Sequence, residues 1–387
     1  MKVAIINLKS LDHMGGAEVW SKEICHLLQD NGIEAIIFYP TVNKNNKVDS
    51  KCSHIEVRPL LFRIFSKFGI INLYPPFLNM DMPDDIEVVY ITTVYPFLLY
   101  HKLLSRGKRV IVGSHDLFTS NTRFGIDTIQ LFTLFLLRLI SNNKNLMAHS
   151  LNSATSEKLK RSRLKVMEIG NEFLVLGKSP DFLEPIEKLG KGHKFKVLFL
   201  GNIEIRKGSH FLPGIIDAFS RREDMEFTFA GKIIDRALKK RLHNMKVLPA
   251  FVGQVSEDKK DILFREADLF LFLSEREASP IVLEEAFSRG GPVISTWKGI
   301  EFMYSARYGL YKIVGRDIGS IVNAIIEFKK VWEADMPDYG LKKHQRSLNY
   351  HEFYDTIPYR DMIKEMFTGS ADHLIKDDTL VTDNSAK

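Results

Sequence analysis

Short runs of β-branched and aromatic residues alternate with longer helical patterns along the whole of this 387-residue chain. Such alternation is typical of parallel sheets whose strands are joined by helices packed on the sheet faces. The rhythm starts again near Phe195, and the chain is too long for one ordinary core. The sequence therefore predicts an α/β protein with two domains that face each other across a cleft. The predicted strands are KVAIINL, EAIIFYP, EVVYITT, KRVIVGS and NLMAHS in the first half, and KVLFLGN, EFTFAGK, KVLPAFVGQ, DLFLFLS and PVIST in the second.

Breaks in this rhythm predict the domain boundaries. The stretch EPIEKLGKGHK carries proline, glycine and charged residues without apolar periodicity, as an interdomain linker does. Near the C-terminus, HEFYDTIPYRDMIKEMF has a helical pattern that Pro358 kinks or interrupts. The predicted divisions are residues 1–183 for the N-terminal domain, 184–194 for the linker, 195–347 for the C-terminal domain, 348–368 for a helix and 369–387 for a disordered polar tail.

Amino-acid composition and net charge indicate which kinds of molecule the protein is expected to bind. The chain has 45% hydrophobic and 26% charged residues, which is typical of a globular protein. Its formal net charge of +6 favours anionic partners. Lysine and arginine are spread along the chain and no base-reading motif occurs, so nucleic acid is not an expected partner.

The number of cysteines and the hydropathy of the sequence indicate where in the cell the protein is expected. Cys25 and Cys52 are too few for a disulfide framework or a four-ligand zinc site, which favours a reducing compartment such as the cytoplasm. The N-terminus lacks the pattern of a signal peptide. Apolar stretches such as residues 126–140, which Arg138 interrupts, fall short of the roughly 20 residues that a bilayer core needs. No membrane-spanning helix is predicted.

The first strand leads into a glycine-containing loop. In KVAIINLKSLDHMGGAEVW, Gly15 and Gly16 stand at the entry to a predicted helix. Glycine lets a ligand approach the backbone, and the N–H groups of a helix start favour phosphate, although a tight turn explains the glycines equally well. The stretch is neither a P-loop nor the GxGxxG fingerprint, which argues against an ATPase and a standard NAD enzyme. A nucleotide-dependent oxidoreductase or epimerase is therefore the weakest interpretation.

His115 follows the predicted strand KRVIVGS, at the carboxyl edge where open α/β sheets bind ligands. The position favours a functional role, whereas a lone histidine is more often a structural hydrogen-bonding residue. No second histidine or cysteine lies at ligand spacing nearby, so no metal site is predicted.

The segment Glu275–Phe287 places four carboxylates around a predicted helix start. We predict Ser279 as its N-cap and Pro280 as its first helical residue, with unpaired N–H groups that suit a phosphate. Glu285 would lie about 7 to 8 Å along the axis from Pro280, at about 1.5 Å per residue, where a carboxylate suits sugar hydroxyls. Glu277 would take a second set of hydroxyls. Unless both glutamates are plain surface charges, they predict a ligand with central phosphates and a polyol at each end.

Such a ligand is a sugar nucleotide, and at these residues the chain resembles a known family. Glu277 and Glu285, in ExxPxVLxEA followed by GGPVIST, resemble the paired-glutamate motif of the retaining GT-B glycosyltransferases of group 1, family 4-like. The resemblance covers nearly the whole chain. It extends to VLFLGNIEIRKG, FVGQVSEDKKDILFREADLFLFLSEREASP, MGGAE, GSHDL and HEFYDTIPYRDMIKEMF.

The resemblance implies GT-B architecture, with two Rossmann-like domains and a C-terminal helix that crosses back to the first. The first domain would bind mainly the acceptor and the second the nucleotide. The implied reaction moves a hexose-type sugar, with retention and without a metal, from a UDP- or GDP-sugar to a glycan or lipid-linked acceptor. The implied catalytic residues are Glu277, at the transferred sugar, His115, at the donor sugar, and Lys207, at the departing phosphates. The implied donor-binding residues are Glu285, at the ribose, Gly16, at the β-phosphate, and Gly15, Asn202, Arg206, Ser279, Ile281 and Val282.

Two departures from the family pattern stand at the expected diphosphate. The family usually has arginine where this chain has Asn202, which removes one of two expected cations, and the nearby Arg206 is a candidate replacement. The usual glycines after the first glutamate are replaced by Ala278, Ser279 and Pro280, which stiffens the loop. A noncatalytic nucleotide-sugar-binding or carbohydrate-binding subunit with the same fold is therefore the alternative prediction.

Residues 59–78, PLLFRIFSKFGIINLYPPFL, set Arg63 and Lys67 one turn apart beside Phe65 and Phe68. This is the pattern of a basic amphipathic helix that lies on an anionic membrane, but a helix packed on the first sheet has the same pattern. The predicted location is therefore cytoplasmic, with peripheral contact at the cytoplasmic membrane face as one of two interpretations.

Overall fold

The computed structural model describes residues 1–7, 16–40, 53–57, 82–115, 124–176, 192–234, 238–240, 251–336 and 338–369. The chain divides into two compact units, each with its own hydrophobic core. Met1–Gly170 and Pro358–Lys387 form the first unit, and Asn171–Ile357 forms the second. Most of the predicted linker lies outside the described residues.

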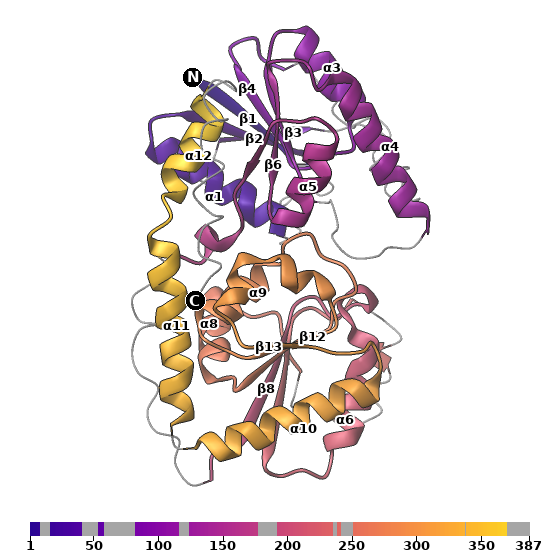
Figure 1. The fold of residues 1–387 in the computed structure, drawn as a ribbon, viewed down its shortest axis with the longest axis vertical. Helices are drawn as coiled ribbons and strands as arrows, with labels where there is room; N and C mark the ends of the chain where they lie inside the picture. Colours follow the sequence, from indigo (N-terminus) through magenta and orange to yellow (C-terminus); the bar gives the residue numbers. More distant parts are fainter. Residues whose placement is uncertain are drawn as a thin grey trace. The chain divides into compact units, whose positions relative to one another are not determined.

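The first unit is built on a seven-stranded parallel sheet in the order β3-β2-β1-β4-β5-β6-β7. Its central strands β4, β5 and β6 are buried at nearly every residue, because helices cover both faces. Right-handed connections place α3, α4 and α5 on one face and α1 on the other, where α12 contacts it (Figure 1). The strands are β1 (Lys2–Ile6), β2 (Glu34–Pro40), β3 (Ser53–Val57), β4 (Val88–Ile91), β5 (Arg109–Gly113), β6 (Leu146–Ser150) and β7 (Val166–Glu168). The helices are α1 (Gly16–Asp30), α3 (Phe97–Ser105), α4 (Phe124–Ile140), α5 (Ser153–Arg161) and α12 (Tyr359–Thr368).

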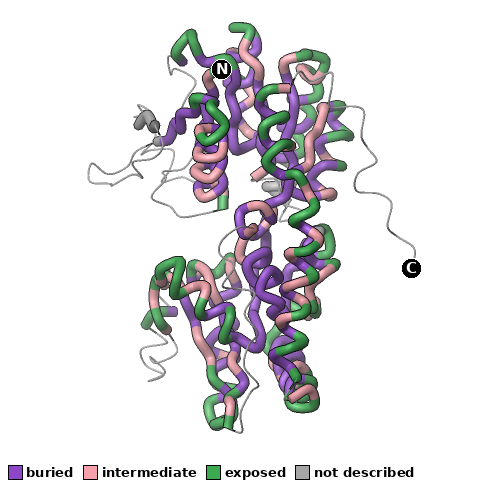
Figure 2. The backbone as a smooth tube through the Cα atoms, turned by 90° about the vertical axis from the view of Figure 1, so that its left-hand side faces the viewer, coloured by how far each residue is buried: buried purple, intermediate pink, exposed green. Residues whose placement is uncertain are grey.

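The second unit is built on a six-stranded parallel sheet in the order β10-β9-β8-β11-β12-β13. Helices α6 and α10 contact each other, as do α9 and α11, and the strands β11 and β12 are buried along their whole length (Figure 2). The strands are β8 (Phe195–Leu200), β9 (Met225–Ala230), β10 (Phe251–Gly253), β11 (Leu269–Phe272), β12 (Val293–Ser295) and β13 (Tyr311–Ile313). The α-helices are α6 (Leu212–Phe219), α8 (Glu257–Glu266), α9 (Ile281–Ser288), α10 (Ile318–Asp335) and α11 (Tyr339–Asp355), and the short 3₁₀ helices are η1 (Glu172–Leu174), η3 (Ile205–Lys207), η4 (Ser209–Phe211), η6 (Lys298–Phe302) and η7 (Tyr304–Arg307).

The predicted α/β class with two parallel-sheet domains is confirmed, and each of the ten predicted strands overlaps a strand of the structure. Strands β3, β7 and β13 were not among the predicted strands. All three stand at sheet edges. Edge strands are short and partly exposed, so they lack the continuous apolar run that marks a central parallel strand.

The segment predicted as one helix over residues 348–368 consists of parts of two helices. Helix α11 already begins at Tyr339 and lies in the second unit, while α12 lies in the first. Pro358 stands between them as the N-cap residue of α12. Proline has no N–H to continue a helix and disfavours helical backbone in the residue before it, so the interruption at Pro358 is confirmed.

The C-terminal end of α12 is anchored on the first sheet by Arg109. Its guanidinium donates to the carbonyls of Met366, at 3.0 Å, and Phe367, at 3.1 Å. The last carbonyls of a helix have no partner within the helix, and a cation there is favourable. The side chains of Ile363, Met366 and Phe367 are fully buried. Arg109 and this apolar face together hold α12 on the first unit.

We predict that Arg109→Met loosens α12, because methionine keeps part of the apolar stem but supplies no donor. The expected loss is about 1 to 3 kcal/mol of local stability. Hydrogen exchange of residues 359–369 should become faster, while the exposed Arg106→Met leaves it unchanged. Unchanged protection of α12 in Arg109→Met would show that apolar packing alone anchors the helix.

Candidate functional site

The loop after β8 carries Arg206 and Lys207 to the carboxyl edge of the second sheet. Both residues lie in η3, and Gly208 follows with a φ of 80°, a conformation that favours glycine. A Cβ on Gly208 would lie 2.2 Å from the carbonyl oxygen of Leu273. Glycine therefore lets this basic loop pack against the chain just beyond β11.

Glu277 is buried and lies against both cations of the basic loop. Lys207 Nζ is 2.5 Å from Glu277 Oε1, and an Arg206 guanidinium nitrogen is 3.4 Å from the same oxygen. Arg206 also donates to the carbonyl of Arg276, at 3.2 Å, and pairs with Glu204, at 3.1 Å. The structure thus brings together three residues that the sequence singled out separately, Arg206, Lys207 and Glu277.

Glu285, also buried, has a different partner. Its Oε1 is 2.5 Å from Nζ of Lys260 on α8, and Lys260 also pairs with Glu257 at 2.6 Å. Burial lowers the pKa of Lys260, but the two carboxylates raise it above its ordinary value overall, so the ammonium stays charged. Lys260 was not predicted as a site residue, because one lysine among the charges of SEDKKD carries no signal of its own.

Helix α8, which positions Lys260, is fixed at its C-terminal end by the buried Lys343. The Lys343 ammonium donates to the carbonyls of Phe264, Arg265 and Ala267, at 3.1, 2.7 and 2.5 Å. These carbonyls lack partners inside the helix. Burial lowers the pKa of Lys343 to about 8.

Glu284 is fully buried and does not join these ion pairs. Its carboxyl oxygens accept hydrogen bonds from the hydroxyls of Ser305 and Tyr350, each at 3.0 Å. Burial, followed by the charge of Glu172, raises the pKa of Glu284 well above its ordinary range. Glu284 is therefore a structural group whose protonated form burial favours, and Glu277 and Glu285 are the buried carboxylates of this segment that face cations.

The predicted N-cap at Ser279 is wrong. Helix α9 begins at Ile281, with Pro280 as its N-cap residue at φ −77° and ψ 113°, and no side chain caps it. The extended ψ of Pro280 delays the helix by one residue, and the carbonyl of Ser279 accepts from Asn171 Nδ2 at 2.7 Å. Ile281 and Val282 form the half-buried first turn, whose N–H groups have no partner within the helix.

In the first unit, His115 lies just beyond the carboxyl end of β5, at one end of a hydrogen-bonded chain. Its Nε2 is 3.0 Å from the Tyr90 hydroxyl, which is 2.7 Å from His149 Nδ1, and His149 Nε2 is 2.9 Å from the carbonyl of Ile169. A Cβ on Gly113 would lie 2.5 Å from the Tyr90 hydroxyl, so glycine makes room for it.

The directions of these hydrogen bonds assign the tautomers of both histidines. A carbonyl only accepts, so His149 Nε2 donates and Nδ1 accepts from Tyr90, whose oxygen in turn accepts from His115 Nε2. Burial lowers the pKa of His149 to about 4, and burial together with His149 lowers that of His115 well below its ordinary value. The Trp20 ring packs against this group, with its centroid 4.5 Å from that of the Tyr90 ring and 4.9 Å from that of the His115 ring. His115 is thus a neutral imidazole whose Nδ1 is an acceptor.

The other predicted site residues are placed as follows. Gly16 is the first residue of α1, so its N–H belongs to the unpaired first turn. Asn202 is exposed, directly after β8. Gly15 and residues 59–78 lie outside the described residues. Within the described part of the chain, no three histidine, cysteine, aspartate or glutamate side chains gather as a metal ion would require.

One segment of the chain matches a known protein family, and the fold of the chain matches solved structures. Residues 181–331, less than half of the chain, match the family model described as "Glycosyl transferases group 1". Among solved structures, sucrose-phosphate synthase from Thermosynechococcus elongatus is similar with a TM-score of 0.66 and 16% identity, over 95% of this chain and 97% of that one. HepE from Anabaena, in complex with UDP-glucose, is similar with a TM-score of 0.63 and 14% identity, over 95% and 99%.

A further similar structure is S. aureus TarM in complex with Fondaparinux, alpha-GlcNAc-glycerol and UDP, with a TM-score of 0.65 and 10% identity over 97% of this chain and 100% of that one. The chain has the GT-B fold, and the match to the group 1 glycosyltransferase model is confined to residues 181–331. The basic loop and the paired glutamates lie in the segment of this GT-B chain that the family model matches. No curated protein matches the chain.

We predict that Glu284→Gln raises the free energy of unfolding at pH 7. A raised carboxyl pKa means that the wild-type group contributes its full stability below its unfolded pKa, near 4.5, and loses it as pH rises. A neutral amide avoids this loss, and the hydroxyls of Ser305 and Tyr350 can donate or accept. The gain in urea unfolding should therefore appear above about pH 4.5 and grow with pH, while the exposed Glu301→Gln shows none. A loss that grows with pH would mean that Glu284 is ionised in the folded protein.

Proposed function

We propose that this GT-B chain is a retaining glycosyltransferase that moves a hexose-type sugar from a UDP- or GDP-sugar to a glycan or lipid-linked acceptor without a metal ion. The observation that carries the proposal is the pairing of Lys207 and Arg206 with the buried carboxylate of Glu277 at the edge of a parallel sheet. That edge is where open α/β sheets bind ligands.

The two cations of the basic loop are suited to a diphosphate. As the nucleoside diphosphate departs, negative charge grows on its oxygens, and cations with oriented N–H groups stabilise that charge. Lys207, Arg206 and the first turn of α9 would supply them. A diphosphate that takes over both cations would free the Glu277 carboxylate to accept hydrogen bonds from the hydroxyls of the transferred sugar.

Glu285 is suited to the ribose. Its Oε1 is engaged by Lys260, and a carboxylate has a second oxygen that can accept from a diol. The contact with Lys260 fixes the orientation of the Glu285 carboxylate.

Sugar transfer with retention needs no dedicated protein nucleophile in this scheme. The bond between the sugar's anomeric carbon and the phosphate oxygen breaks, the acceptor oxygen attacks on the same face, and the departing phosphate takes the acceptor proton. His115 Nδ1 would accept from a donor-sugar hydroxyl, and the Gly16 N–H would face the β-phosphate. Both assignments rest on the resemblance and on the local geometry of the first unit.

The similar structures support a uridine donor as the first candidate, since HepE is described with UDP-glucose and TarM with UDP. A cytoplasmic location and a lipid-linked acceptor belong to the same proposal. A second candidate function, noncatalytic binding of a nucleotide sugar, is favoured by Asn202, which replaces a cation with a neutral amide.

Donor binding tests the proposal directly. Thermal shift against UDP, GDP, ADP, CMP and their sugar conjugates, without added metal, should show one selective stabiliser, and NMR should then show slow hydrolysis of that donor. Glu285→Ala should abolish the shift. Glu257→Gln, which removes the exposed partner of Lys260 and keeps Glu285, is the matched control and should retain it.

The outcomes separate the two candidate functions. A selective shift without hydrolysis, even with lipid and sugar acceptors present, would favour the binding subunit. Full binding and turnover by Glu285→Ala would remove the ribose assignment.

We predict that Arg206 replaces the cation missing at Asn202. Arg206→Met should weaken nucleoside-diphosphate binding about tenfold, equivalent to about 1.4 kcal/mol. Adding Asn202→Arg to that variant should restore part of the affinity, whereas the exposed Arg221→Met should leave it unchanged. Titration calorimetry measures all three. Wild-type affinity in Arg206→Met would assign the diphosphate to Lys207 alone.

A further inference from the structure

Helix α4 of the first unit has an apolar outer face. Leu131, Phe132, Phe135 and Leu139 are 57–68% exposed. Three of them, at i, i+4 and i+8, form a stripe along one side of the helix. Contiguous exposed apolar residues of this size mark an interaction site, whereas single ones do not.

Helix α4 does not expose apolar residues simply because it has too many of them to bury. Its inner face includes polar residues. Gln130 and Thr133 are buried together with Leu134 and Leu137, while larger apolar side chains point outward. A helix that only served the core would place Gln130 and Thr133 outside and the two phenylalanines inside. The outer face is therefore matched to an apolar environment.

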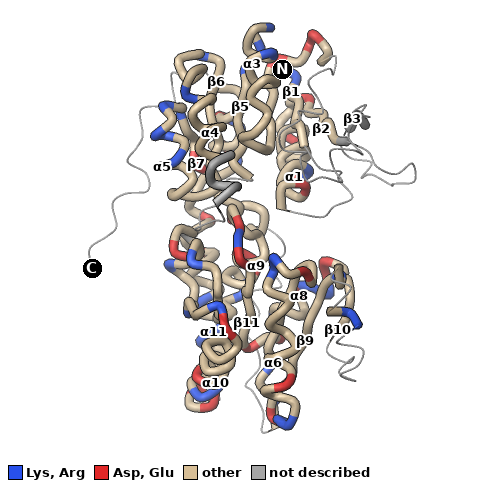
Figure 3. The backbone as a smooth tube through the Cα atoms, turned by 90° about the vertical axis from the view of Figure 1, so that its right-hand side faces the viewer, with Lys and Arg blue, Asp and Glu red and all other residues tan. Residues whose placement is uncertain are grey.

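The surroundings of the stripe are basic. Arg138 lies within it and Lys144 follows it, and both are exposed. The last turn of α5 adds further basic positions, which appear blue in Figure 3. Helix α3 has no acidic residue.

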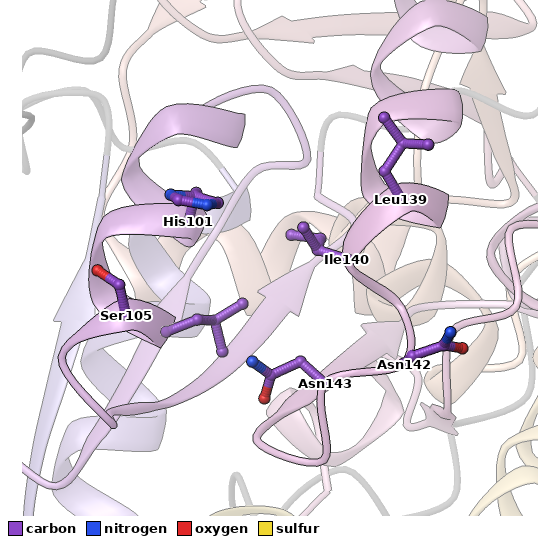
Figure 4. Close-up of a pocket in the computed structure, with 7 residues that line it drawn as sticks. His101, Ser105, Leu139, Ile140, Asn142 and Asn143 are labelled. Carbon is purple, nitrogen blue, oxygen red and sulfur yellow. The ribbon is translucent and has the colours of Figure 1, made fainter.

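A hollow of about 440 Å³ continues the stripe at the C-terminal end of α4. It lies between α3 and α4, and its lining combines apolar side chains with polar ones (Figure 4). The lining includes His101 and Ser105 of α3, Leu139 and Ile140 of α4, and Asn142 and Asn143 beyond it. Such a mixed lining fits the boundary between acyl chains and headgroups.

We propose that the outer face of α4 docks on a bilayer that contains anionic lipids. Leu131, Phe132, Phe135 and Leu139 enter the acyl boundary, while Arg138 and Lys144 extend to the phosphates. A two-fold contact between copies of this chain would bring the same basic patch together with itself and offer it no counter-charge. Anionic lipid headgroups neutralise the basic patch. Charge complementarity therefore favours a membrane over a second copy of the chain. The described helices include none long and apolar enough to span a bilayer, which leaves α4 on its surface.

Vesicle flotation of the full chain tests this proposal. Wild type should float with phosphatidylcholine vesicles that contain about one third phosphatidylglycerol, and less well without the anionic lipid or in high salt. Leu131→Gln combined with Phe135→Gln should reduce binding at least about tenfold, since each change removes exposed apolar surface and leaves the inner face intact. Arg138→Glu with Lys144→Glu should reduce it as well. Val331→Gln with Leu341→Gln, two exposed apolar residues of the second unit, is the matched control.

Three results would overturn the proposal: no flotation of wild type, wild-type flotation of the Leu131 and Phe135 double variant, or a dimer in light scattering that this variant converts to monomer without loss of flotation. The donor thermal shift of the same variants is measured in parallel. Because flotation requires no sugar transfer, failure of the membrane proposal and failure of the transferase proposal are distinguishable.

Discussion

A buried carboxylate is stable only when it is paired or protonated, and the segment Glu277–Glu285 buries three of them. Glu277 is paired with the cations of the basic loop and Glu285 with Lys260 of α8, while Glu284 lies among hydroxyls where burial favours its protonated form. The partners come from the loop after β8, from α8, from η7 and from α11. The three carboxylates therefore connect α9 and the residues before it to four other elements of the second unit.

The first unit also buries a group of polar side chains, but these side chains are uncharged. Its chain from His115 through Tyr90 to His149 ends on a backbone carbonyl, so every member has a partner while the imidazoles stay neutral. Neutral acceptors suit hydroxyl groups, whereas the ionic edge of the second unit suits phosphates. The sugar-nucleotide donor of the proposed function carries both kinds of group.

Much of this architecture was predictable, and the failures have physical causes. Central strands such as β5 and β11 are buried on both faces and show as apolar runs, while the edge strands β3, β7 and β13 do not. The cap at Ser279 failed because the backbone of Pro280 stays extended. The apolar stretch of α4 was visible, but its sequence could not say that Phe132 and Phe135 face outward.

The sequence by itself determined the two parallel sheets, the basic loop with its glycine, and the two glutamates around a helix start. These features depend on periodicity and local backbone conformation, which neighbouring residues decide. Only the tertiary structure decided which cation meets which carboxylate. Lys207 and Glu277 are 70 positions apart, Lys260 and Glu285 are 25 apart, and Glu284 differs from Glu285 only by the face of α9 on which it lies. Burial and the partners of a charge arise from the packing of distant elements, which local sequence patterns do not encode.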